Sequence, residues 1–137
     1  MKRAEIREYV FKLLYCTEFH EDEDLQKQYR LYMENLEQLG EIKEIKEKDK
    51  EYIINRVTDI VSRTDDIDKE IDKVAVSWKT DRMAKADLNI LRLAYYEMNI
   101  DDDIPKPVAV DQAVELAKKY GTDDSPSFVN GVLAKLF

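Results

Sequence analysis

The sequence predicts an all-α protein of about seven helices, and three observations lead to this fold class. Apolar residues recur at three- and four-residue spacing along most of the chain. The 137 residues include only three Gly and three Pro. Hydrophobic residues make up 44% and charged residues 38%, a balance typical of a globular helical protein. We therefore expect one domain, residues 1–137, built from two packed helical subdomains of about residues 1–64 and 65–137.

The first half of the chain contains three helical patterns, over residues 6–17, 25–36 and 53–61. In the first, Ile6, Val10 and Leu14 fall on one face of a helix. Gly40 follows the second pattern and is a typical helix stop. The boundary between the subdomains is expected near Thr64, where Asp65 or Asp66 can cap the next helix.

The second half contains four more patterns, over residues 67–78, 84–98, 110–117 and 125–136. Trp78 is expected at the end of the first of these. The segment 101–107 is the clearest loop, because its acidic cluster and two prolines cannot continue a helix. Gly121 is expected to close the third, and Ser125 to cap the last helix, with Pro126 at its first position.

The net charge of −8 argues against a general nucleic-acid coat protein, but the charge is uneven. Residues 1–16 carry four basic and two acidic side chains, whereas residues 17–51 carry six basic and twelve acidic ones. No apolar run approaches the ~20 residues of a membrane span, and the N-terminus lacks the apolar core of a signal peptide. The single cysteine excludes an internal disulfide framework, so we expect a cytoplasmic protein.

Catalytic and metal-binding residues are scarce. Cys16 and His20 are four residues apart, but a zinc site uses three or four protein ligands. The acidic run 21–24 lacks the spaced ligands and the glycine of a calcium loop, and is better interpreted as a solvated helix start. No Gly-rich phosphate loop or nucleophile elbow is present. We expect neither an enzyme nor a resident metal or cofactor.

The basic N-terminus is a candidate RNA-binding surface. Arg3 and Arg7 lie on the arc continued by Val10 and Leu14, with Lys2 beside them, rather than on the polar arc of the helix. This placement can offer several cations to phosphates, and Arg can bind them bidentately. Alternatively, the two arginines cover edges of the core with their stems or pair with acidic neighbours.

The last helix carries a second candidate surface. Small and polar residues form one strip of this helix: Ser127, Asn130, Gly131 and Ala134. The strip is suited either to close packing of another helix or to the approach of a nucleic-acid backbone or base edge, with the Asn130 amide as donor and acceptor. Phe128, just after the helix start, either stacks on a nucleobase or packs in the core.

Three segments of the second half resemble the NusB family in order and spacing. They are the block Asp87-Leu-Asn-Ile-Leu-Arg92-Leu-Ala-Tyr-Tyr-Glu97, preceded by Trp78 and Arg82; the block Pro105 to Gly121, which contains AVELAKKYG; and Ser125-Pro-Ser-Phe-Val-Asn-Gly-Val-Leu133. The basic helix ending in Leu14-Tyr15 resembles the start of the same family.

The resemblance implies an all-α bundle that acts in transcription antitermination. Such proteins bind boxA RNA of ribosomal operons together with a small-subunit ribosomal protein that acts as NusE, and the complex modifies elongating RNA polymerase. Carried over to this chain, the resemblance implies RNA contacts at Lys2, Arg3, Arg7, Ser125, Ser127, Phe128 and Asn130. It implies that Asp87 contacts the protein partner.

The N-terminal segment departs from the family pattern, because Glu5 and Glu8 interrupt its basic residues. We therefore expect weak RNA binding without the partner, and a shallow dependence on salt. Two other functions stay open: a helical module that binds only proteins, and the accessory domain of an RNA methyltransferase, which requires a following catalytic domain. The sequence leaves open whether the free protein forms a homodimer.

Overall fold

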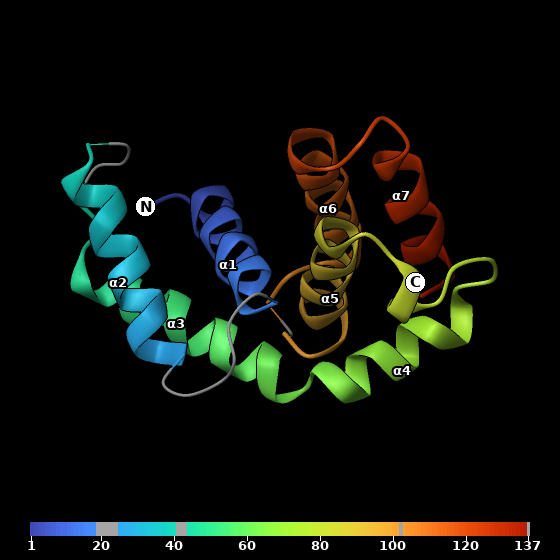
Figure 1. The fold of residues 1–137 in the computed structure, drawn as a ribbon. Helices are drawn as coiled ribbons and strands as arrows, with labels where there is room; N and C mark the ends of the chain where they lie inside the picture. Colours follow the sequence, from blue (N-terminus) through green and yellow to red (C-terminus); the bar gives the residue numbers. More distant parts are fainter. Residues whose placement is uncertain (19–24, 41–43, 102, 137) are drawn as a thin grey trace. The chain divides into compact units, whose positions relative to one another are not determined.

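A computed structural model describes residues 1–18, 25–40, 44–101 and 103–136. Within these residues it contains seven α-helices, one short 3-10 helix and no strand, so the prediction of an all-α fold is confirmed (Figure 1). The chain divides into two compact units, Met1–Val61 and Ser62–Phe137, and each is described by itself. No helix in the described part of the chain is long and apolar enough to cross a membrane.

The first unit consists of α1 (Arg3–Thr17), α2 (Leu25–Gln38) and most of α3 (Glu47–Ser62). Each helix buries one apolar face, and the fully buried side chains include Val10, Leu13, Met33, Ile53 and Val57. Gly40 follows α2 with φ of 72°, a left-handed conformation in which only glycine avoids a steric cost. The expected helix stop is thus present.

The third helix begins at Glu47, well before the position expected from its apolar residues. In its charged first turns Lys50 is buried, and the Lys50 ammonium lies 2.8 Å from Glu37 Oε1. The side chains of this pair are 11% and 17% exposed. A buried charge requires such a partner, which apolar periodicity cannot reveal.

The second unit contains α4 (Thr64–Val74), the 3-10 helix η1 (Thr80–Arg82), α5 (Lys85–Asn99), α6 (Lys106–Tyr120) and α7 (Ser125–Lys135). Helix α5 packs against α4, α6 and α7, and α6 packs against α7 (Figure 1). This central place explains why α5 is apolar on several faces, with Leu88, Ile90, Leu91, Leu93 and Ala94 all buried.

An ion pair joins α5 to α4. Arg92 donates from Nε and Nη2 to the two oxygens of Asp68, at 2.8 and 2.7 Å, and from Nη1 to the Asn89 side chain. The side chains of Arg92 and Asp68 are only 12% and 21% exposed. Arg92 of the block that resembles the NusB family therefore has a structural role, with Asp68 as its acceptor.

The ends of several helices differ from the sequence-based expectation. Helix α4 ends at Val74, so Trp78 lies in the following loop rather than on the helix. Asp65 and Asp66 lie in its first turn, where the positive end of the helix dipole favours them, and neither is the cap. Pro107 lies in the first turn of α6, which tolerates proline because its N–H groups have no helical partners.

Candidate recognition pocket

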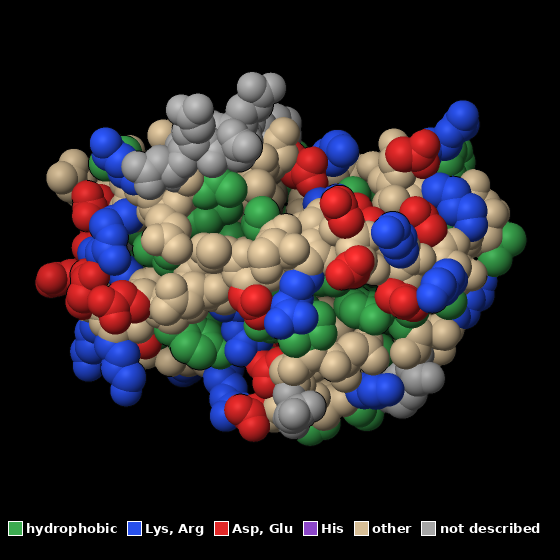
Figure 2. All heavy atoms as spheres, turned by 90° about the horizontal axis from the view of Figure 1, so that it is seen from below, with side chains coloured by type: hydrophobic (Ala, Val, Ile, Leu, Met, Phe, Trp, Pro, Cys, Tyr) green, Lys and Arg blue, Asp and Glu red, His purple; other side chains and the backbone are tan. Residues whose placement is uncertain are grey.

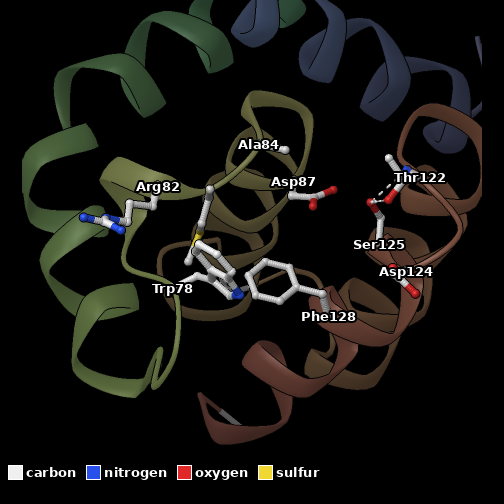
Figure 3. A pocket seen from close by; sticks show the side chains of 9 residues that line it. Trp78, Arg82, Ala84, Asp87, Thr122, Asp124, Ser125 and Phe128 are labelled. Atoms are coloured by element: carbon white, nitrogen blue, oxygen red, sulfur yellow. Dashed lines mark hydrogen bonds between the residues drawn. The ribbon is translucent and has the colours of Figure 1, made fainter.

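A cavity of about 260 Å³ lies in the second unit, between the start of α5, the start of α7 and the loop after α4. Its apolar walls come from Trp78, Met83 and Phe128, and its charged groups from Arg82, Asp87 and Asp124. Both Trp78 and Phe128 line this cavity, and in the view of Figure 3 the Arg82 guanidinium points away from their rings. The cavity therefore combines aromatic faces with carboxylates.

The start of α7 is held by the corner between α6 and α7. Asp124, not Ser125, is the N-cap, and Ser125 is the first helical residue, 2% exposed. Its hydroxyl accepts a 2.9 Å hydrogen bond from the backbone N–H of Thr122 (Figure 3). The prediction that Ser125 caps the helix is wrong, because the chain turns one residue earlier and the hydroxyl instead fixes the corner.

Gly121 makes this corner possible. A Cβ at position 121 would lie 2.4 Å from both Cβ and Oγ of Ser125, a distance that atoms cannot adopt. The glycine therefore allows the end of α6 to approach the start of α7, and this approach places Phe128 at the cavity.

Asp87 is the unusual polar group of the pocket. It lies in the first turn of α5, and its Oδ1 is buried without a hydrogen-bond partner among the described residues. Leaving a buried carboxylate oxygen unbonded costs folding free energy, so such an atom calls for an explanation. In a cavity that two aromatic side chains also line, this oxygen is suited to accept a hydrogen bond from a cation or an amino group.

The residues predicted at the start of α7 are divided between two faces. Phe128 and Ser125 line the pocket with Asp87, whereas Ser127 and Asn130 line a polar groove with Asp111, Gln112, Glu115 and Lys118 of α6. Lys118 is paired with Glu115 at 3.1 Å. Because this groove carries two carboxylates and one paired ammonium, it is better suited to base edges than to phosphates.

The small strip of α7 does not pack against another helix of its unit. Ser127, Asn130, Gly131 and Ala134 are all exposed. A Cβ built on Gly131 meets no described atom within 4 Å. The interpretation that Gly131 permits close packing within its unit is therefore wrong.

The predicted cations of the first unit lie at the start of α1. Lys2 and Arg3 are exposed, and Arg7 is half-buried. Arg7 takes part in interactions within the chain, in line with the alternative that it covers the core edge. Figure 2 shows acidic and basic side chains interspersed on the face it draws, without a continuous patch of either sign.

The other candidate chemistry has a simple explanation where it is described. Burial raises the pKa of the Cys16 thiol, which disfavours the nucleophilic thiolate. His20 and the acidic run 21–24 lie outside the described residues. Among the residues that the structure does describe, no group of three or more His, Cys, Asp or Glu side chains could hold a metal ion.

The pocket contains residues to which the sequence patterns assign no role. Trp78, Arg82 and Met83 form one wall of it. Apolar periodicity places Trp78 on a helix, and therefore does not predict its position beside Phe128. The only available signal is that Trp78 and Arg82 precede the block resembling the NusB family.

In the described residues the structure is that of an all-α helical protein with a small pocket lined by aromatic and acidic side chains. Comparison with known proteins gives the particular family. The profile of the NusB family matches residues 4–137, and the chain therefore belongs to the NusB family. The resemblance found in the sequence is confirmed. The relatives of this chain in the family are transcription antitermination proteins.

The similarity extends over nearly complete chains. The transcription antitermination protein NusB of Agathobacter rectalis is 45% identical over 135 residues, which cover 98% of each chain. The corresponding protein of Lachnoclostridium phytofermentans is 44% identical and is covered to 98% of its length.

Solved structures agree with this family. The structure of T. maritima NusB has a TM-score of 0.83 at 36% identity and is covered to 90% of its length, against 99% of this chain. A crystal structure of antitermination factors NusB and NusE in complex with double-stranded RNA has a TM-score of 0.77 at 25% identity, with 99% of this chain and 97% of that chain covered.

Proposed function

We propose that this chain is a non-catalytic adaptor in the cytoplasm that binds boxA-type single-stranded RNA together with a small-subunit ribosomal protein acting as NusE. The assembled complex would then modify elongating RNA polymerase. The similarity to NusB in the structure of NusB and NusE with double-stranded RNA supports NusE and RNA as partners. The similarity to antitermination proteins over 98% of their length favours this role over that of an accessory domain in a methyltransferase.

The observation that carries the proposal is that Asp87 and Phe128 line one cavity. Asp87 is expected to contact the protein partner, and Phe128 to contact RNA. We propose that a cationic side chain of the partner bonds to the unsatisfied Oδ1 of Asp87 while a nucleobase stacks on Phe128. Because both ligands then occupy neighbouring positions, each stabilises the binding of the other.

The remaining RNA contacts are proposed on two further surfaces. Lys2, Arg3 and Arg7 attract the phosphate backbone from the first unit. Ser127 and Asn130 offer hydroxyl and amide groups to base edges in the groove beside α6. Since the Ser125 hydroxyl is engaged by Thr122, its part in RNA binding is to hold the start of α7.

Titration of labelled boxA RNA with this chain, with and without the ribosomal protein, tests the proposal. We expect the pair to bind much more tightly than the chain alone, because few cations face the RNA. Equal affinity for the chain and the pair would contradict the proposed cooperation.

The competing function is a module that binds only proteins. The observation that favours it is that Arg7 is half-buried and takes part in interactions within the chain. Asn130→Ala separates this function from RNA binding. Because Asn130 is exposed, the substitution should leave the fold intact. A variant that binds RNA unchanged would remove Asn130 from the proposed RNA surface.

A further inference from the structure

The loop after α4 exposes two large apolar side chains. Val76 is 78% exposed and Trp78 is 54% exposed, although Ala75 and Thr80 on either side of them are buried. Exposed apolar side chains of this size are common on mobile loops, where nothing fixes them. Here the two ends of the loop are tied down by side chains that lie outside the pocket.

The first tie is formed by Asp72 on α4. Its Oδ1 accepts a 2.8 Å hydrogen bond from the backbone N–H of Thr80, and its Oδ2 accepts a 3.0 Å bond from the Thr80 hydroxyl. A carboxylate that accepts two hydrogen bonds from one residue fixes both its position and its orientation. The start of η1 is thus joined to the last turn of α4.

The second tie is formed by Lys79. Its ammonium donates to the carbonyl oxygens of Asp72 and Ala75, at 2.7 and 2.8 Å. These carbonyls lie at the C-terminal end of α4, where the helix dipole is negative and the last carbonyls lack helical partners. Lys79 therefore closes the end of α4 and holds the following backbone over it.

Trp78 lies within the loop that both sets of bonds close, and it is next in sequence to Lys79. We propose that Asp72, Thr80 and Lys79 are positioning residues, which hold the loop 75–79 so that Trp78 faces Phe128 across the pocket before any ligand binds. None of the three lines the pocket, so they act through Trp78. The inference rests on the proposed function, because it assigns the fixed loop a part in recognition. A wall that is already ordered loses less conformational entropy on binding.

The test uses Trp78 itself, since it is the single tryptophan of the chain and reports on the loop without a label. Lys79→Met removes both bonds to α4 but keeps the aliphatic stem, and Thr80→Val removes the hydroxyl at nearly constant shape. Lys73→Met is the matched control, because Lys73 lies on α4, the helix to which Lys79 bonds, and it forms an ion pair with Glu70 on the same helix. Thr80→Ser is the conservative rescue.

Acrylamide quenching of Trp78 in the full chain alone measures loop order, and titration of labelled boxA RNA with the ribosomal protein measures binding. We expect Lys79→Met and Thr80→Val to increase quenching and to weaken binding by roughly three- to tenfold, as for loss of an ordered side chain. Lys73→Met and Thr80→Ser should match the wild type in both measurements, and thermal unfolding should confirm that Lys79→Met, at an exposed position, remains folded.

Unchanged quenching, or increased quenching with unchanged affinity, would overturn the positioning role. Weaker binding with unchanged quenching would also overturn it, because the residue would then act otherwise than through Trp78. If the wild type failed to bind the RNA and the ribosomal protein, the proposed function would fail, and quenching alone would still decide whether these residues hold Trp78.

Discussion

The two units of the chain present different kinds of candidate recognition surface. Residues 62–137 contain a pocket, and hydrogen bonds and a glycine corner hold elements that line it, while an ion pair joins two helices of the unit. Residues 1–61 present exposed cations at the start of a helix. Shape and hydrogen bonding can select a ligand in the second unit, whereas the first contributes charge, which attracts any phosphate chain.

The largest difference between the units should be seen in stability. Asp68→Ala leaves the largely buried Arg92 guanidinium without its two bonds to a carboxylate, and should lower the free energy of unfolding by about 3 kcal/mol. Glu37→Ala in the first unit should cost only about 1–2 kcal/mol, because the flexible Lys50 stem lets its ammonium reach water. Urea unfolding followed by circular dichroism measures both, and a larger loss for Glu37→Ala would reverse this comparison.

The next largest effect should separate binding from stability in the pocket. Asp87→Asn should weaken assembly with the ribosomal protein and RNA by roughly 30-fold, since a desolvated charge contact is worth about 2 kcal/mol or more. Its free energy of unfolding should stay within about 1 kcal/mol of the wild type, because no described group bonds to Oδ1. Calorimetry and thermal unfolding measure the two quantities.

Asp81→Asn is the control for this variant, because Asp81 is exposed on η1 and does not line the pocket. Its affinity should equal that of the wild type. An equal loss in both variants would mean that overall charge, rather than the pocket, governs assembly.

A smaller effect is expected from the cations of the first unit. The double variant Arg3→Ala and Arg7→Ala should weaken RNA binding about tenfold and lower the salt slope by about two, because each arginine is proposed to neutralise one phosphate. RNA titrations at several salt concentrations measure the slope, and Lys27→Ala, an exposed lysine on α2, is the matched control. Unchanged RNA binding with an intact fold would favour a module that binds only proteins.

The smallest effect is expected at Gly131. A methyl group there meets no described atom, so Gly131→Ala should raise the free energy of unfolding by about 0.5–1 kcal/mol through helix propensity. Chemical denaturation measures this gain. If the same variant also binds RNA more weakly, the glycine serves the approach of a ligand; if it binds equally well, the exposed strip takes no part in recognition.

Apolar periodicity predicts the helices because each buries a regular face, and this information is local. The pocket depends on contacts that periodicity does not contain. The end of α4 is set by Asp72 and Lys79 through bonds to residues outside the helical repeat, so periodicity places Trp78 on the wrong element. A linear motif groups neighbouring residues of α7 together and so predicts one surface for Phe128 and Asn130. In the structure these two residues lie on different faces of the helix.

Some expectations come from the family resemblance rather than from periodicity. The place of Asp87 at the start of α5 follows from its motif, but its closeness to Phe128 depends on the packing of α5 against α7. The burial of Ser125 depends on the tight corner at Gly121. Both facts concern three-dimensional distances that no spacing in the chain encodes directly.

The corner at Gly121 also has a consequence for how this protein can vary. The residue does not line the pocket, yet any side chain there would push Ser125 away and shift the first turn of α7, on which Phe128 is carried. The position of Phe128 in the pocket therefore depends on the absence of a side chain at Gly121, a residue that does not line the pocket. Changes of ligand preference should arise more readily by substitution of the pocket's own side chains than by any substitution at this corner.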